Sequence, residues 1–241
     1  MPAAQTRPLK DLKPIRSKSL VDEIVDAIVE ATATGVFLPG DRIVEAEVAR
    51  AMNVSRIPVR EALRLLESQG VVVSERYRGM RLMSVNIEQL EKTLQVRLAL
   101  ERLAGEAVMT RLKQDPGLLA PLEEIVVLMR EAAQRGDAFE VASLDTAFHR
   151  SLCELSGNDV LLRTWEPLSR QLTIIFGLST MRKDISGIVD EHDEVIDTLK
   201  AGDVAGYDAV MVRHILEYPR AIDYEQLVEQ LSQIEGRRKA L

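Results

Sequence analysis

The stretch LPGDRIVEAEVARAMNVSRIPVREALRLLESQGVVV, residues 38–73, decides how the first part of the chain folds. Within it, apolar residues recur at helical spacing in two short runs, about 44–52 and 55–68. Asn53 follows the first run, and asparagine tolerates the left-handed backbone conformation that closes a helix. Ser55 stands where a hydroxyl group caps the second run. We therefore expect two helices joined by a tight turn.

The residues on either side of this pair complete a small domain. Upstream, residues 19–34 carry apolar side chains at helical spacing, and Gly35 follows them as a stop signal. Downstream, the β-rich runs 71–73 and 81–83 are joined by a charged tip, which predicts a hairpin. Three helices followed by a hairpin make a winged helix-turn-helix, which we expect over residues 19–85.

The remainder of the chain carries long helical patterns and no convincing strand. Glycine or proline marks most junctions between these patterns. The expected helices cover about 86–113, 117–135, 137–156, 158–180, 185–200 and 203–235. The series predicts an antiparallel all-α helical bundle over residues 86–235, followed by a tail at 236–241. The expected fold class of the whole chain is therefore mainly α.

The composition excludes several other classes of protein. Of the 241 residues, 46% are hydrophobic and 29% are charged, as is usual for globular proteins. No apolar run approaches the roughly 20 residues that span a bilayer, and the first residues do not resemble a signal peptide. Cys153 is the only cysteine, so an intrachain disulfide is excluded. We expect a cytoplasmic protein with no membrane partner.

Charge is distributed unevenly along the chain. Residues 1–85 hold 13 Lys and Arg against 11 Asp and Glu, whereas residues 86–241 hold 18 against 27. Residues 1–18 contain five Lys and Arg and three prolines among few apolar residues, which predicts a flexible basic arm. A basic segment attached to an acidic body favours a DNA-binding module on a domain with another task.

The second helix of the pair is the candidate DNA reader. In a helix-turn-helix this element lies in the major groove with its N-terminal residues at the base edges. Those residues include Ser55, Arg56 and Arg60, and Arg64 extends the same helical face by one turn. Arginine is the commonest reader of guanine, through paired hydrogen bonds.

The tip of the hairpin is a second candidate contact, with the DNA backbone or the minor groove. Its residues are Arg76, Tyr77, Arg78 and Gly79. The alternative for all of these arginines is a solvated surface on which they pair with Glu61, Glu67 and Glu75.

All three histidines of the chain lie in the expected bundle. Asp145 and His149 are four residues apart, so they share one helical face. His192 and His214 lie among apolar residues on the inward faces of two further helices. One carboxylate and three imidazoles would thus converge, which is how bundles build metal sites, for Zn, Ni, Fe, Mn or Co. The residues leave open the alternative of three satisfied core histidines.

Three further positions are expected to be structural. Asn158 follows a glycine at a helix start and is expected to cap that helix. Cys153 lies one turn beyond His149 and is expected to be a buried spectator thiol. Trp165 is expected in the core or in an interface.

The order PGDRI, then VSRIPVREALRLLESQG, then a wing with RG resembles the GntR family of bacterial transcription regulators. The resemblance implies that this block binds DNA as one half of a dimer. The sequence departs from the family pattern at Val44, where serine is common, and at Asn53, where glycine is common. Ala46 stands where a basic or polar residue is sometimes found, which removes one possible DNA contact.

The helical half is similar to the FCD effector domain of FadR-type regulators. That domain carries Asp-x3-His, then His, then His on three helices, and the pattern is matched by Asp145, His149, His192 and His214. The similarity implies a divalent metal whose coordination is completed by a small carboxylate effector. It also implies that Arg97 faces the ligand cavity, where it would hold a carboxylate through two hydrogen bonds. The alternative for Arg97 is a surface ion pair with Glu101.

These patterns together predict a homodimeric, ligand-responsive transcription regulator, most simply a repressor, that binds a double-stranded operator. Effector and metal would shift the bundle, and the helix at 86–113 would carry the change to the DNA-binding domains. The rival class is a metal-dependent hydrolase or oxygenase with an incidental DNA-binding module. This class is disfavoured because no further histidine remains to act as a base.

Overall fold

The computed structural model describes residues 19–75, 79–84, 87–180 and 185–220 and the positions 222, 226, 227, 229 and 233. Helix α1 (Leu20–Ala33) is the first element of its N-terminal part. Ser19 caps this helix, because its hydroxyl accepts a hydrogen bond from the Asp22 amide while the Asp22 carboxylate accepts from Ser19. The other elements of this part are β1 (Arg42–Ile43), α2 (Glu45–Ala51), α3 (Arg56–Ser68), β2 (Val72–Glu75) and β3 (Gly79–Leu82).

The turn between α2 and α3 confirms one expectation and corrects another. Asn53 has a φ of 54°, so the left-handed conformation expected of it is present. Ser55 occupies the capping position before α3, but its hydroxyl makes no capping hydrogen bond. Val44 likewise gives α2 no side-chain cap, as its apolar side chain requires.

The sheet of the winged part has three strands, in the order β1-β3-β2. The hairpin β2–β3 was expected, and Val72 pairs with Leu82 in its antiparallel register. Strand β1 was not expected, because two residues carry no alternating pattern. It pairs with β3 through Arg42 opposite Arg81 and so ties the turn before α2 to the hairpin.

The bundle follows with long helices joined by short turns. Gly136 and Gly202 adopt the left-handed conformation that ends α5 and α8. The elements are α4 (Ile87–Leu112), α5 (Ala120–Arg135), α6 (Ala138–Leu155), α7 (Asp159–Thr180), α8 (Ser186–Ala201), α9 (Val204–Val212), the π-helical turn η1 (Arg213–Glu217) and α10 (Tyr218–Arg220). The prediction of one uninterrupted helix from 203 was wrong, because a π-helical turn intervenes after α9. The predicted span to 235 extends beyond the continuously described residues.

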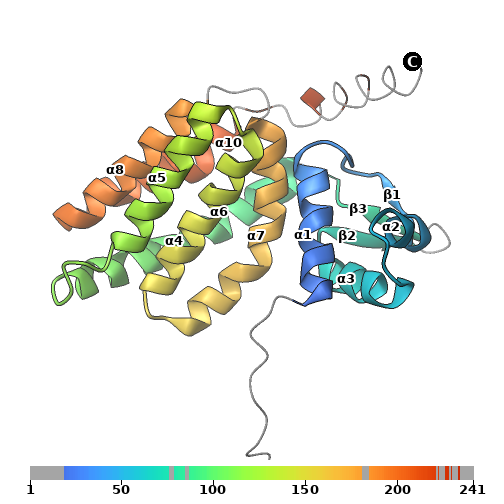
Figure 1. Ribbon diagram of the computed structural model, residues 1–241. Helices are drawn as coiled ribbons and strands as arrows, with labels where there is room; N and C mark the ends of the chain where they lie inside the picture. Colours follow the sequence, from blue (N-terminus) through green and yellow to red (C-terminus); the bar gives the residue numbers. More distant parts are fainter. Residues whose placement is uncertain are drawn as a thin grey trace, which may run out of the picture.

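The two parts lie side by side, and α7 faces α1 across the junction (Figure 1). Gly177 of α7 is buried there, directly against Ala33 of α1. Further along α7, the Gln171 side-chain amide donates a hydrogen bond to the carbonyl oxygen of Gln69, the residue that ends α3 (2.5 Å). Helix α7 therefore touches two of the three helices of the winged part.

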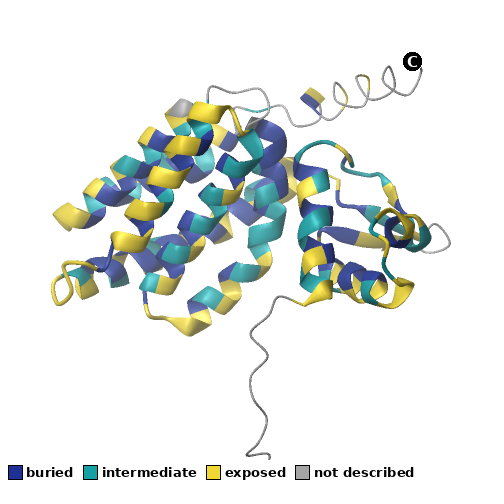
Figure 2. Ribbon diagram, in the orientation of Figure 1, coloured by how far each residue is buried: buried dark blue, intermediate teal, exposed yellow. Residues whose placement is uncertain are grey.

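Buried residues run through the middle of the bundle and along its contact with α1 (Figure 2). Most are aliphatic, but among the described residues one arginine, two acids and three histidines are buried with them: Arg97, Glu101, Asp145, His149, His192 and His214. Groups of this kind are seldom buried without partners, so their contacts define the site. Among the described residues, no helix has both the length and the apolar character needed to cross a membrane.

Candidate metal centre and DNA-binding surface

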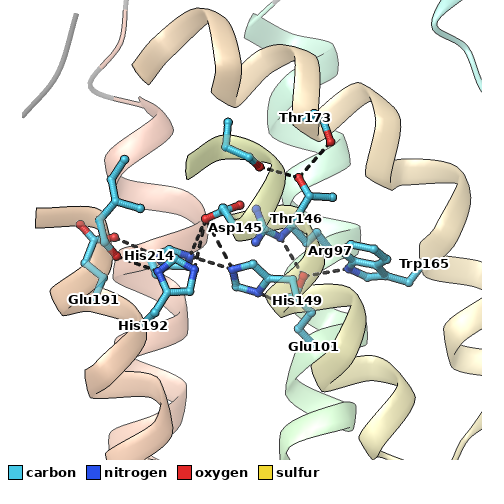
Figure 3. A network of polar contacts seen from close by, with 12 residues as sticks. Arg97, Glu101, Asp145, Thr146, His149, Trp165, Thr173, Glu191, His192 and His214 are labelled. Atoms are coloured by element: carbon cyan, nitrogen blue, oxygen red, sulfur yellow. Dashed lines mark hydrogen bonds and ion pairs between the residues drawn. The ribbon is translucent and has the colours of Figure 1, made fainter. Parts of the chain in front are cut away.

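Four buried side chains from three elements converge in the bundle (Figure 3). Helix α6 supplies Asp145 and His149 one turn apart, α8 supplies His192, and η1 supplies His214. Each offers one ligand atom, and these atoms all lie within 4.8 Å of one another. The convergence expected from the spacing of these residues is therefore present.

The distances have the size found between donor atoms that share one ion. Oδ1 of Asp145 lies 3.2 Å from Nε2 of His192, 3.7 Å from Nε2 of His214 and 3.9 Å from Nε2 of His149. The Nε2 atoms of His149 and His214 are 2.9 Å apart. Ligands bound at roughly 2.1 Å from a zinc ion are separated by about 3 Å or slightly more.

The other ring nitrogen of each histidine faces an oxygen that can only accept a hydrogen bond. Nδ1 of His149 lies 2.6 Å from Oε2 of Glu101. Nδ1 of His192 lies 2.7 Å from the carbonyl oxygen of Ile188, and Nδ1 of His214 lies 2.7 Å from Oε2 of Glu191. Each Nδ1 must therefore carry the proton of the neutral ring, which leaves the Nε2 lone pair directed at the centre.

The residues present fit a divalent cation. With Nδ1 protonated, the Nε2 atoms of His149 and His214 place two lone pairs against each other at 2.9 Å, which is unfavourable unless a cation lies between them. Oδ2 of Asp145 is buried and has no hydrogen-bond partner among the described residues. A buried acceptor without a partner is costly, and a bound cation would remove that cost.

The protonation states agree with this donor set. Burial lowers the pKa of His149 to about 4 and that of His214 to about 3, with the charge of Arg97 and the neighbouring His192 adding to the respective shifts. Burial alone would raise the pKa of Asp145, but the imidazoles of His192 and His149 and the charge of Arg97 hold it well below the usual range. Neutral imidazoles beside an ionised carboxylate are the forms that ligate metals.

Arg97 lies beside this cluster and forms a buried ion pair with Glu101 (Figure 3). Its Nε donates to Oε1 of Glu101 at 2.7 Å, and both side chains are at most 1% exposed. The alternative of a surface pair is therefore wrong. Burial would raise the pKa of Glu101, yet Arg97 and His149 lower it to about 2. Nη1 and Nη2 of Arg97 are buried and have no partner among the described residues.

A small cavity of about 50 Å³ adjoins the cluster. Asp145 and His214 line it, with Glu191, Ser179 and Tyr218 as further residues that carry polar groups, and its remaining lining is apolar. Phe176 of α7 lines the cavity and also lies under the guanidinium group of Arg97, whose Cζ is 5.2 Å from the ring centroid. A space with apolar walls and a few directed polar groups is typical of ligand sites.

Three neighbouring residues have the structural roles expected of them. Asn158 caps α7, because its Oδ1 accepts a hydrogen bond from the Leu161 amide at 3.1 Å. Cys153 is completely buried outside the cluster, and burial raises the pKa of its thiol. Trp165 is completely buried, and its Nε1 donates to Oε1 of Glu101 at 2.8 Å.

The sequence did not single out Glu101 or Glu191 as partners of the histidines. Only the position of Glu191 next to His192 could have suggested a role, and Glu191 turns out to hold His214 from a different element. Glu101 is separated from His149 by 48 positions, so no spacing rule connects them.

The arginines predicted to read DNA are exposed on α3. Arg56, Arg60 and Arg64 are exposed on α3, and Ser55 before the helix is exposed as well. Arg60 forms an ion pair with Glu45 of α2, with Nη2 and Oε2 2.9 Å apart, rather than with any of the three expected acids. The pair is exposed, so it holds Arg60 weakly and leaves it available.

The wing is described only in part. Gly79 is exposed at the start of β3, with a φ of 83° that favours glycine. Arg76, Tyr77 and Arg78 lie outside the described residues.

Comparison with known families decides the class of the protein. The model of the gntR family of bacterial regulatory proteins matches residues 20–82, and that of the FCD domain matches residues 92–217. The chain belongs to the GntR family of transcription regulators. It falls in the FadR-type branch, in which an FCD domain follows the helix-turn-helix.

Curated relatives of this GntR regulator align with it along most of their length. The probable D-xylose utilization operon transcriptional repressor of Paenarthrobacter nicotinovorans is 27% identical over 86% of this chain and 90% of that protein. The gluconate operon transcriptional repressor of Bacillus subtilis (strain 168) is 27% identical over 71% of this chain and 72% of its own. Among solved structures, E. coli McbR/YncC has the same fold, with a TM-score of 0.70, 20% identity and coverage of 91% of this chain and 100% of its own.

Family membership decides between the two predicted classes of protein. The GntR regulator is a DNA-binding transcription regulator and not an enzyme, so the rival prediction of a metal-dependent enzyme is wrong. Its FCD domain implies a small-molecule effector, and the buried cluster of one aspartate and three histidines has the donors to hold a metal ion.

Proposed function

We propose that this GntR regulator is a homodimeric, cytoplasmic repressor whose affinity for its operator is controlled by a small carboxylate bound at a divalent metal ion in the bundle. We assign the winged helix-turn-helix to residues 19–85 and the effector domain to residues 86–235. The observation that carries the proposal is the position of Arg97. This buried arginine has two terminal nitrogens without a described partner, and it lies beside a cluster of metal-ligating side chains.

Asp145, His149, His192 and His214 would hold the metal. An ion bound to them supplies a positive centre that attracts a carboxylate oxygen. One carboxylate and three imidazoles suit Zn, Ni, Mn or Fe. Four protein ligands leave a position open when the ion takes five or six ligands.

Arg97 would bind the effector. A guanidinium group with Nη1 and Nη2 free matches the two oxygens of a carboxylate. The cavity of about 50 Å³ limits the part of the molecule that it holds to a small group, and the hydroxyl-bearing side chains of Ser179 and Tyr218 line it. A small organic acid fits these features, and a neutral sugar does not use the charge of Arg97.

Helix α7 is better placed than the helix at 86–113 to carry the signal. Phe176 contacts Arg97 and lines the cavity, and the next residue, Gly177, abuts Ala33 of the winged part. Gln171 of the same helix donates to Gln69 at the end of α3. A shift of α7 on effector binding would thus move α1 and α3 together. In a dimer, that movement changes the spacing of two recognition helices and so the affinity for a two-fold operator.

On the DNA, Arg56, Arg60 and Arg64 of α3 would contact base edges, with Ser55 at a phosphate. The wing would contact the backbone or the minor groove through Arg76, Tyr77, Arg78 and Gly79.

The test measures binding of the metal-loaded protein to DNA from the region upstream of its own gene. Small organic acids are added at increasing concentration, and the amount of DNA retained by the protein is recorded. Gluconate is the first probe, because one relative is named for a gluconate operon, and D-xylose is the neutral control, because another is named for D-xylose utilization. We expect at least one organic acid to change retention while D-xylose does not. The Arg97→Lys variant keeps the positive charge but lacks the paired Nη1 and Nη2 atoms. It should still bind DNA and metal, but its DNA binding should not respond to the organic acid. No response to any organic acid, or an unchanged response in Arg97→Lys, would refute the effector assignment.

A further inference from the structure

We propose that Glu101 is the positioning residue that joins the metal site to the carboxylate clamp, by holding His149 and Arg97 at the same time. This inference rests on the proposed function, since it assigns a role toward the metal and the effector to a residue that binds neither.

One buried carboxylate receives three hydrogen bonds from three different side chains. Oε1 of Glu101 accepts from Nε of Arg97 at 2.7 Å and from Nε1 of Trp165 at 2.8 Å, and Oε2 accepts from Nδ1 of His149 at 2.6 Å. Glu101 itself is 0% exposed. Arg97 and Trp165 can only donate, and the buried charge of Arg97 keeps the carboxylate ionised, so Oε2 can only accept from Nδ1 of His149.

The contact with His149 decides what that ring presents to the metal. Because Glu101 can only accept, the proton of the neutral imidazole stays on Nδ1, and the lone pair stays on Nε2. Acceptors of this kind orient metal-binding histidines and make them better ligands. Without Glu101, His149 would be free to place its proton on Nε2 and face the centre with a donor.

The contact with Arg97 decides which nitrogens are free. Glu101 takes Nε and leaves Nη1 and Nη2, the edge of the guanidinium group that binds a carboxylate in parallel. On another side, Cζ of Arg97 lies over the Phe176 ring, 5.2 Å from its centroid. The same carboxylate therefore orients both groups that the effector and the ion would use.

The backbone at this position is also held firmly. The Tyr207 hydroxyl donates to the backbone carbonyl oxygen of Glu101 at 2.8 Å, so a hydrogen bond joins α9 to α4 at this residue. One turn along α4, Gly105 leaves room for the Tyr207 ring, which any added Cβ would overlap. Glu101 therefore has little freedom to shift, so the loss of one partner leaves its hydrogen bonds to the others in place.

The experiment compares the Glu101→Gln and Trp165→Phe variants with the wild type. Glutamine preserves the size of the side chain but turns an NH₂ group toward one of its three donors. Trp165→Phe removes one hydrogen bond to the same carboxylate without touching His149 or Arg97, so it controls for a purely structural effect. Nitrogen-15 NMR of the metal-free protein reports which nitrogen of His149 carries the proton and whether the Nε–H of Arg97 is protected from exchange. Zn²⁺ titration then gives the metal affinity.

In the wild type we expect the proton of His149 on Nδ1 and a protected Nε–H on Arg97. Glu101→Gln should lose both signatures and bind Zn²⁺ about 10- to 100-fold more weakly, whereas Trp165→Phe keeps both signatures and its Zn²⁺ affinity. The inference would be overturned if Glu101→Gln bound Zn²⁺ as tightly as the wild type does. It would also be overturned if Trp165→Phe lost as much Zn²⁺ affinity as Glu101→Gln. If Glu101→Gln does not fold, the wild-type spectrum decides, because a proton on Nε2 of His149 contradicts the proposed contact. If the wild type binds no Zn²⁺ or other divalent ion, the proposed function fails, and the two NMR signatures still test Glu101.

Discussion

Gly177 of α7 and Ala33 of α1 meet without an intervening side chain: a Cβ built at position 177 would lie 2.6 Å from the Cβ of Ala33 and 2.9 Å from its carbonyl oxygen. The two halves of the molecule are thus in backbone contact one residue away from Phe176, which lies under Arg97. Close packing of this kind transmits displacement, because interiors are dense and resist compression.

Substitution of Gly177 by alanine should therefore disturb the junction. Forced overpacking costs about 1–3 kcal/mol of unfolding free energy, which exceeds the gain of up to about 1 kcal/mol that alanine gives a helix interior. We expect a lower melting temperature and an altered DNA response with unchanged metal content. Gly187→Ala is the control, because a Cβ there meets nothing within 4 Å. Equal stability of the two variants would contradict a tight junction.

Substitution of Arg60 by alanine should weaken operator binding by about 1–3 kcal/mol and leave the fold intact, because the pair with Glu45 is exposed. Fluorescence anisotropy with operator DNA and thermal unfolding measure the two effects. Arg130→Ala removes an exposed arginine of α5 that pairs with Asp193, and it should leave operator affinity unchanged. Equal affinities of the two variants for the operator would refute the role of Arg60.

Substitution of His192 by alanine should abolish metal binding and the effector response while basal DNA binding remains. One of four ligands is lost, and Oδ1 of Asp145 loses its nearest imidazole. Elemental analysis of the purified protein measures the metal. Cys153→Ala is the matched control, since Cys153 is equally buried but lies outside the four-residue group. Wild-type metal content in His192→Ala would show that the site is wrong.

Acidification should destabilise the metal-free protein between about pH 6.5 and pH 4. The pKa values of His149 and His214 are lowered on folding to about 4 and about 3. In this window the unfolded chain therefore binds more protons than the folded one, and stability falls as the pH falls. The slope approaches about 1.4 kcal/mol per pH unit for each histidine. Chemical denaturation at several pH values measures it.

Two variants and the bound metal check the origin of that slope. The double variant His149→Gln, His214→Gln should lose most of the dependence above pH 5. Bound metal should make the unfolding free energy depend more steeply on pH, because protons compete with the ion for Nε2 of the histidines. A flat profile in the metal-free wild type would contradict the neutral, buried state of the two rings.

The local elements were predictable because their causes are local. The order of the helices follows from apolar spacing and from turn residues such as Asn53 and Gly136, whose left-handed conformations the structure confirms. Strand β1 and the π-helical turn at His214 were missed, since two paired residues and one widened turn leave no periodic signal. Ser55 was expected to cap α3 and does not, because residue type favours a cap without fixing the direction of the hydroxyl.

The sequence by itself determined that one carboxylate and three imidazoles face inward, because spacing along a helix sets the face on which a side chain lies. It also predicted the helix α3 and the exposed positions of its arginines. Only the tertiary structure decided that Glu101 and Glu191 hold the histidines, that the Arg97–Glu101 pair is buried, and that α7 rather than α4 lies against α1. These contacts join residues far apart along the chain, and their partners are selected by how the helices pack together, which no local pattern records.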